Sequence, residues 1–190
     1  MELAPDNANL IFARGYAGFT QGLWKSSGED FEKAIRLVSG NADYYKYAGA
    51  CNYYLKNQVE AESELKKALG INPDDPETYY YLGMVANYLK NLPQQGYDYM
   101  TNALRLDDSE AEYYYQRAKS SYELTDYVKG MEDVQKALKM YRGNGNFYAL
   151  RGMLRLKLKY EDDQICEDFN KAYELGTFYR IKKEYKRHCK

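Results

Sequence analysis

The side chains that most often perform chemistry in proteins are scarce in this chain of 190 residues. It has one histidine, His188, and three cysteines, Cys51, Cys166 and Cys189. His188 stands beside Cys189 near the C-terminus, and the sequence implies no third group to complete a nucleophile, base and acid arrangement. One histidine and an odd number of cysteines also provide no familiar metal-ligand spacing. We therefore predict no catalytic residue, no metal site and no cofactor, and expect the chain not to be an enzyme.

Two further motifs look like functional loops but are better explained as turns. Gly143, Asn144 and Gly145 have neither a preceding strand pattern nor a following Gly-Lys-Ser/Thr, so they predict a turn between helices rather than a phosphate-binding loop. The carboxylates 161–163 fall in a predicted turn, where we expect them to face solvent. Tyrosine is the unusual residue, at 23 of 190, and any functional interpretation has to place it.

The elements that position these residues are predicted from composition and repetition. Hydrophobic residues make up 45% and charged residues 29%, with only 4 prolines, so the chain has enough apolar material to fold. Small residues recur in sets separated by 12 and then 7 residues, or by 13 and 7 in the third set, Gly83, Gly96 and Ala103, and successive sets begin 34 residues apart with one-residue insertions. The sets with this spacing are Gly15, Ser27 and Ala34; Gly49, Ala61 and Ala68; and Ala118, Gly130 and Ala137.

A large residue precedes one small residue of each repeat. Phe31, Leu65, Met100, Val134 and Phe169 each stand three residues before an alanine. In a pair of amphipathic helices, small side chains allow close approach along the crossing, and large ones fill the facing holes. The turn-forming residues 72–76, 107–109 and 143–145 lie where one pair would end and the next begin.

This pattern is similar to the 34-residue tetratricopeptide repeat, a helix-turn-helix unit. The resemblance implies an all-α fold, a right-handed superhelical α-solenoid. We assign residues 1–7 to an N-terminal extension and residues 8–179 to five repeats, with boundaries at 8–41, 42–75, 76–110, 111–144 and 145–179. The one-residue insertions fall in the turns near Pro93 and Tyr160.

The C-terminal segment 177–190 does not match a repeat. Phe178, Ile181, Tyr185 and Cys189 recur there at helical spacing, which predicts a helix that caps the last repeat. Cys166 would lie on the second helix of repeat 5. If the cap folds back, the two cysteines can form a disulfide, which implies an oxidising compartment; otherwise they are two unlinked thiols. Repeat 5 and this tail also resemble repeat proteins of the Bacteroidetes.

Charge and hydropathy limit the partners and the compartment. The formal net charge is -1, but the C-terminal segment 180–190 has six basic residues and a single acid, Glu184. This run could touch nucleic acid or an anionic membrane; we favour the solvated face of an end helix, and expect no nucleic-acid partner. No run of about 18 apolar residues predicts membrane insertion. The start, Met1 to Pro5, lacks a signal-peptide pattern, so the chain as written is expected in the cytoplasm, or in the periplasm or outside the cell if a signal was removed.

The resemblance also implies where a ligand would bind. In the family, positions 2, 5, 9, 12 and 13 of each repeat face the concave wall, because steps of three and four residues return to one helical face. The residues that we place in this groove are Phe12, Tyr16, Lys46, Tyr53, Tyr54, Tyr80, Met84, Tyr88, Tyr115, Lys119 and Tyr122. Any single tyrosine among them has a plain alternative role, which is packing between neighbouring helices.

Three functions fit this groove. We favour a non-enzymatic scaffold that binds an extended peptide or protein segment. In the second, tyrosine rings stack on sugar faces beside Glu77, Asn87 and Glu112, in a glycan-binding or glycan-transport accessory protein. In the third, the solenoid associates with copies of itself. The sequence specifies neither the partner nor the oligomeric state.

Overall fold

Helices form the entire regular structure of the part of the chain that can be described. The computed structural model describes residues 7–189, with the side chains of residues 178–180 left aside, so most of the predicted extension 1–7 and Lys190 of the predicted cap lie outside it. Within 7–189 there are eleven helices and no strand, which confirms the predicted all-α helical-repeat fold. The helices are α1 (Ala8–Thr20), α2 (Trp24–Leu37), α3 (Ala42–Tyr54), α4 (Gln58–Ile71), α5 (Pro76–Tyr88), α6 (Pro93–Leu106), α7 (Ala111–Glu123), α8 (Tyr127–Met140), α9 (Gly145–Lys157), α10 (Asp162–Glu174) and α11 (Phe178–His188).

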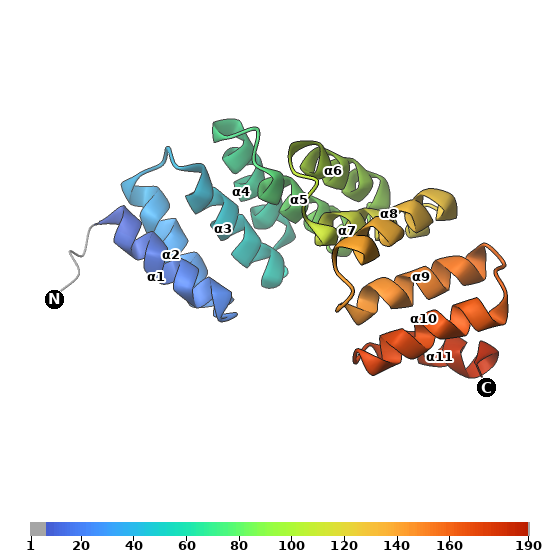
Figure 1. The fold of residues 1–190 in the computed structure, drawn as a ribbon. Helices are drawn as coiled ribbons and strands as arrows, with labels where there is room; N and C mark the ends of the chain where they lie inside the picture. The colour runs from blue at the N-terminus through green and yellow to red at the C-terminus, as the bar shows by residue number, and fades with distance from the viewer. Residues whose placement is uncertain (1–6, 190) are drawn as a thin grey trace. The chain divides into compact units, whose positions relative to one another are not determined.

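The chain divides into two compact units, Met1–Leu106 and Asp107–Lys190. The first unit contains the helix pairs α1/α2, α3/α4 and α5/α6, and the second contains α7/α8, α9/α10 and the final helix α11 (Figure 1). Each of the five repeats that we propose contains one helix pair. None of the described helices combines the length and the apolar character that crossing a membrane requires.

Polar side chains cap the beginning of the first helix in four of the five pairs, α7 being the exception. The side chain of Asn7 accepts hydrogen bonds from the backbone N–H groups of Asn9 and Leu10, and Asp75 accepts one from Thr78. Asn41 and Asn144 cap α3 and α9 in the same way. Each cap satisfies an N–H group that has no partner within the helix, which typically stabilises the helix by about 1 kcal/mol.

The connections within the helix pairs are short and contain backbone in the left-handed region. Residues 21–23, 55–57 and 124–126 join three of the pairs, and residues 89–92 and 158–161 join the other two with one residue more. The residues with positive φ in these connections are Gly22 (78°), Lys56 (67°), Asn91 (53°), Thr125 (62°) and Lys159 (60°). Glycine adopts this conformation without cost, whereas a β-branched residue such as Thr125 does so rarely.

The core of each pair is built by the small and large residues that the repeat pattern predicts. Phe31, Leu65, Met100, Val134 and Phe169 are all 0% exposed. A Cβ atom on Gly49 would lie 2.7 Å from Cγ of Leu65, and one on Gly152 would lie 2.5 Å from Cε1 of Phe169. Glycine at these positions therefore allows the two helices of a pair to approach closely.

An arginine-aspartate pair links the two helices in three of the five pairs. Arg14 with Asp30, Arg117 with Asp133, and Arg151 with Asp168 connect α1 to α2, α7 to α8 and α9 to α10. The burial of these pairs differs: the side-chain exposures are 64% and 17% for the first, 17% and 6% for the second, and 19% and 0% for the third.

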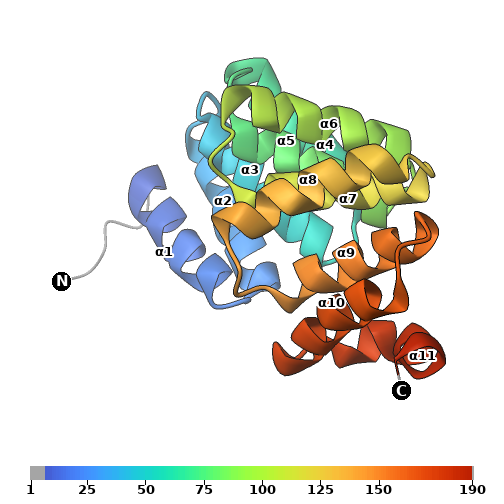
Figure 2. The same ribbon diagram turned by 45° about the vertical axis from the view of Figure 1, so that its right-hand side comes forward.

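The final helix packs on α10 (Figure 2) and is linked to it by a disulfide. Ile181, which is 1% exposed, joins the core formed by Ile165, Phe169 and Ala172. Cys166 and Cys189 form a disulfide with Cα atoms 5.4 Å apart. The phenol of Tyr185 donates a hydrogen bond to Oδ1 of Asn170, at 2.8 Å. The sequence left this disulfide open against two free thiols.

Chemical labelling should separate the three cysteines. Cys51 is 1% exposed, and burial raises the pKa of its thiol to about 12. Because the thiolate is the reactive form, we expect no alkylation by iodoacetamide at pH 8 in the native, unreduced protein. After mild reduction two sites should be labelled, and the third only after unfolding. Rapid native labelling of Cys51, measured by mass spectrometry, is the result that would contradict this.

Candidate functional site

The predicted groove residues separate into buried, half-buried and exposed groups. Lys46, Tyr53 and Tyr115 are buried, at 7%, 6% and 6% exposure. Tyr16, Tyr54 and Tyr88 are exposed, at 42%, 37% and 42%. The remaining five residues are half-buried: Phe12, Tyr80, Met84, Lys119 and Tyr122. Eight of the eleven lie in the first unit, so the candidate site belongs to that unit.

The prediction that Lys46 presents its charge in the groove is wrong, because the side chain is buried among three carboxylates. Its Nζ atom lies 3.0 Å from Oδ1 of Asp43, 3.3 Å from Oδ2 of Asp75 and 3.1 Å from Oε2 of Glu77. Burial alone would lower the pKa of Lys46, but the carboxylates of Glu77, Asp43 and Asp75 more than offset this, and the pKa is raised. The lysine therefore ties α3 to the start of α5 and does not present its charge to a ligand.

Tyr47, which is not among the predicted groove residues, is the centre of an aromatic cluster. Its ring centroid lies 5.0 Å from that of Tyr16, 5.3 Å from Phe19 and 5.9 Å from Phe12. Its hydroxyl donates to Oε2 of Glu77 at 3.1 Å. Burial, together with the Glu77 carboxylate, raises the pKa of Tyr47, so the phenol stays neutral. Tyr47 stands seven residues before Tyr54, two helical turns, and this spacing was the available signal.

Tyr54 is held in place by a stacked tryptophan. The rings of Trp24 and Tyr54 are 4.1 Å apart at an interplanar angle of 12°, and Phe19 lies 6.0 Å from Tyr54. A ring fixed in this way loses little freedom when a ligand covers it. Tyr53, by contrast, is a core residue, and burial raises its pKa to about 12.

The helices α1, α3 and α5 together present what we call the aromatic face. Tyr80, Met84 and Tyr88 follow each other at intervals of four residues along α5, so they share one side of that helix. The ring of Tyr81 lies 5.3 Å from Tyr80. Burial raises the pKa of the Tyr81 hydroxyl, and the nearby carboxylate of Glu77 raises it further. We define the aromatic face as Phe12, Tyr16, Tyr47, Tyr54, Tyr80, Met84 and Tyr88.

The aromatic face is acidic at the end where α3 and α5 begin. Asp43, Asp75 and Glu77 surround the single cation Lys46, which leaves this cluster with two uncompensated negative charges. Residues 7–106 have ten basic and eleven acidic residues, so the excess negative charge is local to this cluster. The electrostatic field near the cluster therefore favours a cationic group.

The three predicted residues of the second unit have local packing roles. Tyr115 is buried against Phe147, with ring centroids 4.9 Å apart, and Nζ of Lys119 lies 5.9 Å from the centre of the Tyr115 ring. Tyr122 packs on Tyr127 at 5.6 Å. The prediction that Tyr115 lines the groove is therefore wrong. It is a core residue, because a ring with 6% exposure cannot anchor a ligand.

The part of the chain that the structure describes contains no candidate metal site. Among residues 7–189, no group of three or more histidine, cysteine, aspartate or glutamate side chains is arranged to hold a metal ion. His188 Nδ1 lies 3.2 Å from Oδ1 of Asp162, an exposed contact between α11 and the start of α10.

Comparison with known proteins identifies the fold. No family model and no curated protein matches the chain. Among solved structures, it is similar to YrrB, described as a TPR protein with an unusual peptide-binding site, at 17% identity and a TM-score of 0.74 over 97% of this chain and 94% of that one. A tetratricopeptide repeat protein from Parabacteroides merdae aligns at 18% identity and a TM-score of 0.68, over 94% of this chain and 69% of that one.

A third similar structure comes from a larger complex. The APC/C hetero-tetramer Cut9-Hcn1 aligns at 17% identity and a TM-score of 0.87, covering 98% of this chain and 37% of that one. At these identities the likeness establishes the architecture and leaves the ligand open. The chain has the fold of a tetratricopeptide-repeat protein.

Proposed function

We propose that the chain is a binding scaffold whose aromatic face holds an extended peptide segment of a protein partner. The observation that carries the proposal is the set of three exposed tyrosines, Tyr16, Tyr54 and Tyr88, one on the first helix of each pair in the first unit. Tyrosine combines a large apolar ring with a hydroxyl at low rotamer cost, and the hydroxyl can pair with backbone groups of an extended peptide.

The expected affinity follows from the area that these rings still expose. An aromatic side chain buries about 150–250 Å² when it is fully covered, at about 25 cal/mol per Å². Since Tyr16, Tyr54 and Tyr88 are about two-fifths exposed, each has roughly 2 kcal/mol to offer at most, before the entropy of binding is subtracted. Three such anchors with polar contacts support affinities around the micromolar range.

The charge of the face suggests the composition of the peptide. The uncompensated carboxylates near Lys46 favour lysine or arginine in the ligand, and the tyrosine rings offer those cations a π face as well. Apolar side chains of the same peptide would cover Met84 and the ring of Phe12. YrrB, which has the same fold, is described as having a peptide-binding site, which supports a peptide as the ligand class.

Selection from a peptide library, followed by titration, tests the proposal. The selected peptides should be rich in basic and aromatic residues. The double variant Tyr16→Ala/Tyr54→Ala should weaken their binding at least about tenfold, since each ring is an exposed anchor. Fluorescence anisotropy gives the dissociation constant, and circular dichroism checks that the helices are retained.

Tyr160→Ala provides the matched control. Tyr160 has the same 42% exposure as Tyr16 but lies in the connection between α9 and α10, in the second unit. Its loss should change the dissociation constant less than about twofold. Equal binding by wild type and the double variant would refute the site. Specific binding of an oligosaccharide on an array, with no peptide selected, would replace the peptide with a glycan.

A further inference from the structure

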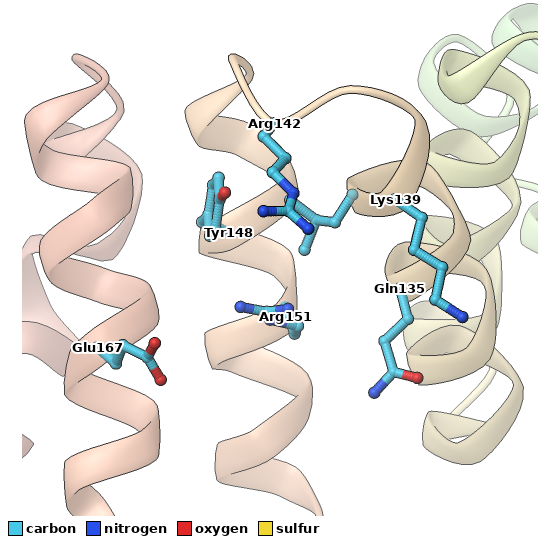
Figure 3. Close-up of a pocket in the computed structure, with 7 residues that line it drawn as sticks. Gln135, Lys139, Arg142, Tyr148, Arg151 and Glu167 are labelled. Carbon is cyan, nitrogen blue, oxygen red and sulfur yellow. The ribbon is translucent and has the colours of Figure 1, made fainter.

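The second unit contains a cavity that the aromatic face does not use. It has a volume of about 410 Å³ and lies among α8, the connection that follows it, α9 and α10 (Figure 3). Three cationic side chains line it, together with one carboxylate, one amide and one aromatic ring. These residues are Gln135, Lys139, Arg142, Tyr148, Arg151 and Glu167.

Arg151 is a fixed cation at the wall of this cavity. Its Nε atom donates to both carboxylate oxygens of Asp168 at 3.0 Å, and its Nη2 donates to Oδ1 at 2.6 Å. Asp168 is 0% exposed, and the guanidinium lies 5.5 Å from the centre of the Tyr148 ring. Both contacts hold the guanidinium plane in one orientation, so it loses little conformational freedom when a ligand binds.

Lys139 and Arg142 supply charge that the protein does not neutralise. Both are exposed, and among residues 7–189 neither forms an ion pair. Arg142 comes from the connection after α8, and in Figure 3 its side chain lies alongside α9, above Arg151. The carboxylate of Glu167, the one acid that lines the cavity, lies 3.8 Å from Nη1 of Arg155. The cavity therefore carries a net positive charge.

We propose that this cavity binds the phosphoryl group of a phosphate monoester. A carboxylate carries one negative charge, which is fewer than the two positive charges of Lys139 and Arg142. A phosphoryl group offers three terminal oxygens and about -1.5 to -2 charges at pH 7. The volume exceeds that of the anion alone, and Leu138 and the Tyr148 ring form an apolar wall for the carbon group attached to it.

The same group can come from a small metabolite or from a phosphorylated peptide, and calorimetry can distinguish them. The probes are inorganic phosphate, O-phospho-L-serine, a short phosphoserine peptide and its unphosphorylated form, with acetate as the carboxylate. We expect saturable binding of the phosphorylated probes and none of the unphosphorylated peptide. A tighter constant for the phosphopeptide than for phosphoserine assigns the site to a peptide, and equal constants assign it to a small molecule.

The double variant Lys139→Ala/Arg142→Ala tests the location, with Arg151 kept because its ion pair with the buried Asp168 links α9 to α10. Losing two charge-assisted contacts should weaken phosphoserine binding at least about tenfold. The control is Lys182→Ala/Lys183→Ala, which removes the same charge from exposed positions of α11 in the same unit. Its effect should stay within about twofold.

Three results would overturn the proposal. The first is the absence of saturable phosphate or phosphoserine binding to the wild-type chain. The second is equal weakening of phosphoserine binding by both double variants, which would show that the effect depends on net charge and not on this cavity. The third is a tighter constant for acetate than for phosphate, which would reject the phosphoryl group as the ligand.

Discussion

Replacing Asp168 with alanine should destabilise the second unit by about 3–5 kcal/mol, the cost of breaking a buried ion pair from one side. Asp168 is 0% exposed and is the counter-charge for two guanidinium groups, those of Arg151 and Arg155, which are 19% and 15% exposed. Without the carboxylate both cations would remain largely desolvated with no partner. Denaturant unfolding, with hydrogen exchange of residues 145–189 as the local probe, measures the effect.

Asp30→Ala is the matched control, because it breaks the same type of ion pair at a more solvent-exposed position. Arg14 is 64% exposed, so its charge can return to water, and we expect a loss of no more than about 1 kcal/mol. The comparison isolates burial from the arginine-aspartate geometry, which is bidentate in both pairs. Equal losses at the two positions would show that burial is not what makes Asp168 important.

Removing the disulfide between Cys166 and Cys189 should cause the second largest loss of stability that we predict. Cys166 and Cys189 are 23 residues apart in sequence, and closing a loop of this length restricts the unfolded chain by about 3 kcal/mol. In Cys166→Ser/Cys189→Ser we therefore expect α11 to leave α10 more often, carrying Ile181 out of the core. Backbone amides of α11 should exchange markedly faster, as measured by hydrogen exchange with mass spectrometry.

Cys51→Ala controls for the loss of a sulfur atom without the loss of a cross-link. Cys51 is an unpaired buried thiol in the first unit, so its replacement should leave the exchange of α11 unchanged. Reduction of the wild-type chain should reproduce the double variant. Unchanged protection of α11 in the reduced chain would mean that its apolar contacts alone hold it to α10.

The framework of the fold was predictable because it depends on local spacing. The large residues that precede an alanine, such as Phe31 and Leu65, were placed in the core by the repeat pattern, and both are 0% exposed. The beginnings of the helices could be predicted for the same reason, since a cap such as Asn41 acts only on its own helix.

The candidate site was less predictable because it depends on contacts between repeats. Lys46 looked like an exposed cation on its own helix, yet two of its three carboxylates, Asp75 and Glu77, come from around the start of α5. Tyr115 fitted a groove position but packs on Phe147 of the next helix pair. A single helical stripe does not contain this information.

The arginine-aspartate pairs were missed for a different reason. Arg117 and Asp133 are 16 residues apart, a spacing that has no meaning within one helix. It becomes informative only once the repeats are aligned and the same two positions hold the same two residue types. In the second pair these positions are occupied by Ala48 and Glu64, so even an aligned pattern is incomplete.

Thr125 shows that the packed helices, rather than the residues of the connection, determine the backbone geometry of this turn. Its φ of 62° is the conformation in the connection of α7 to α8 that its β-branched side chain least favours. Glycine or asparagine would adopt this conformation more easily. The shape of the connection is therefore set by the packing of the helices on either side. In energy-landscape terms Thr125 is a point of local frustration, tolerated because the rest of the repeat is consistent.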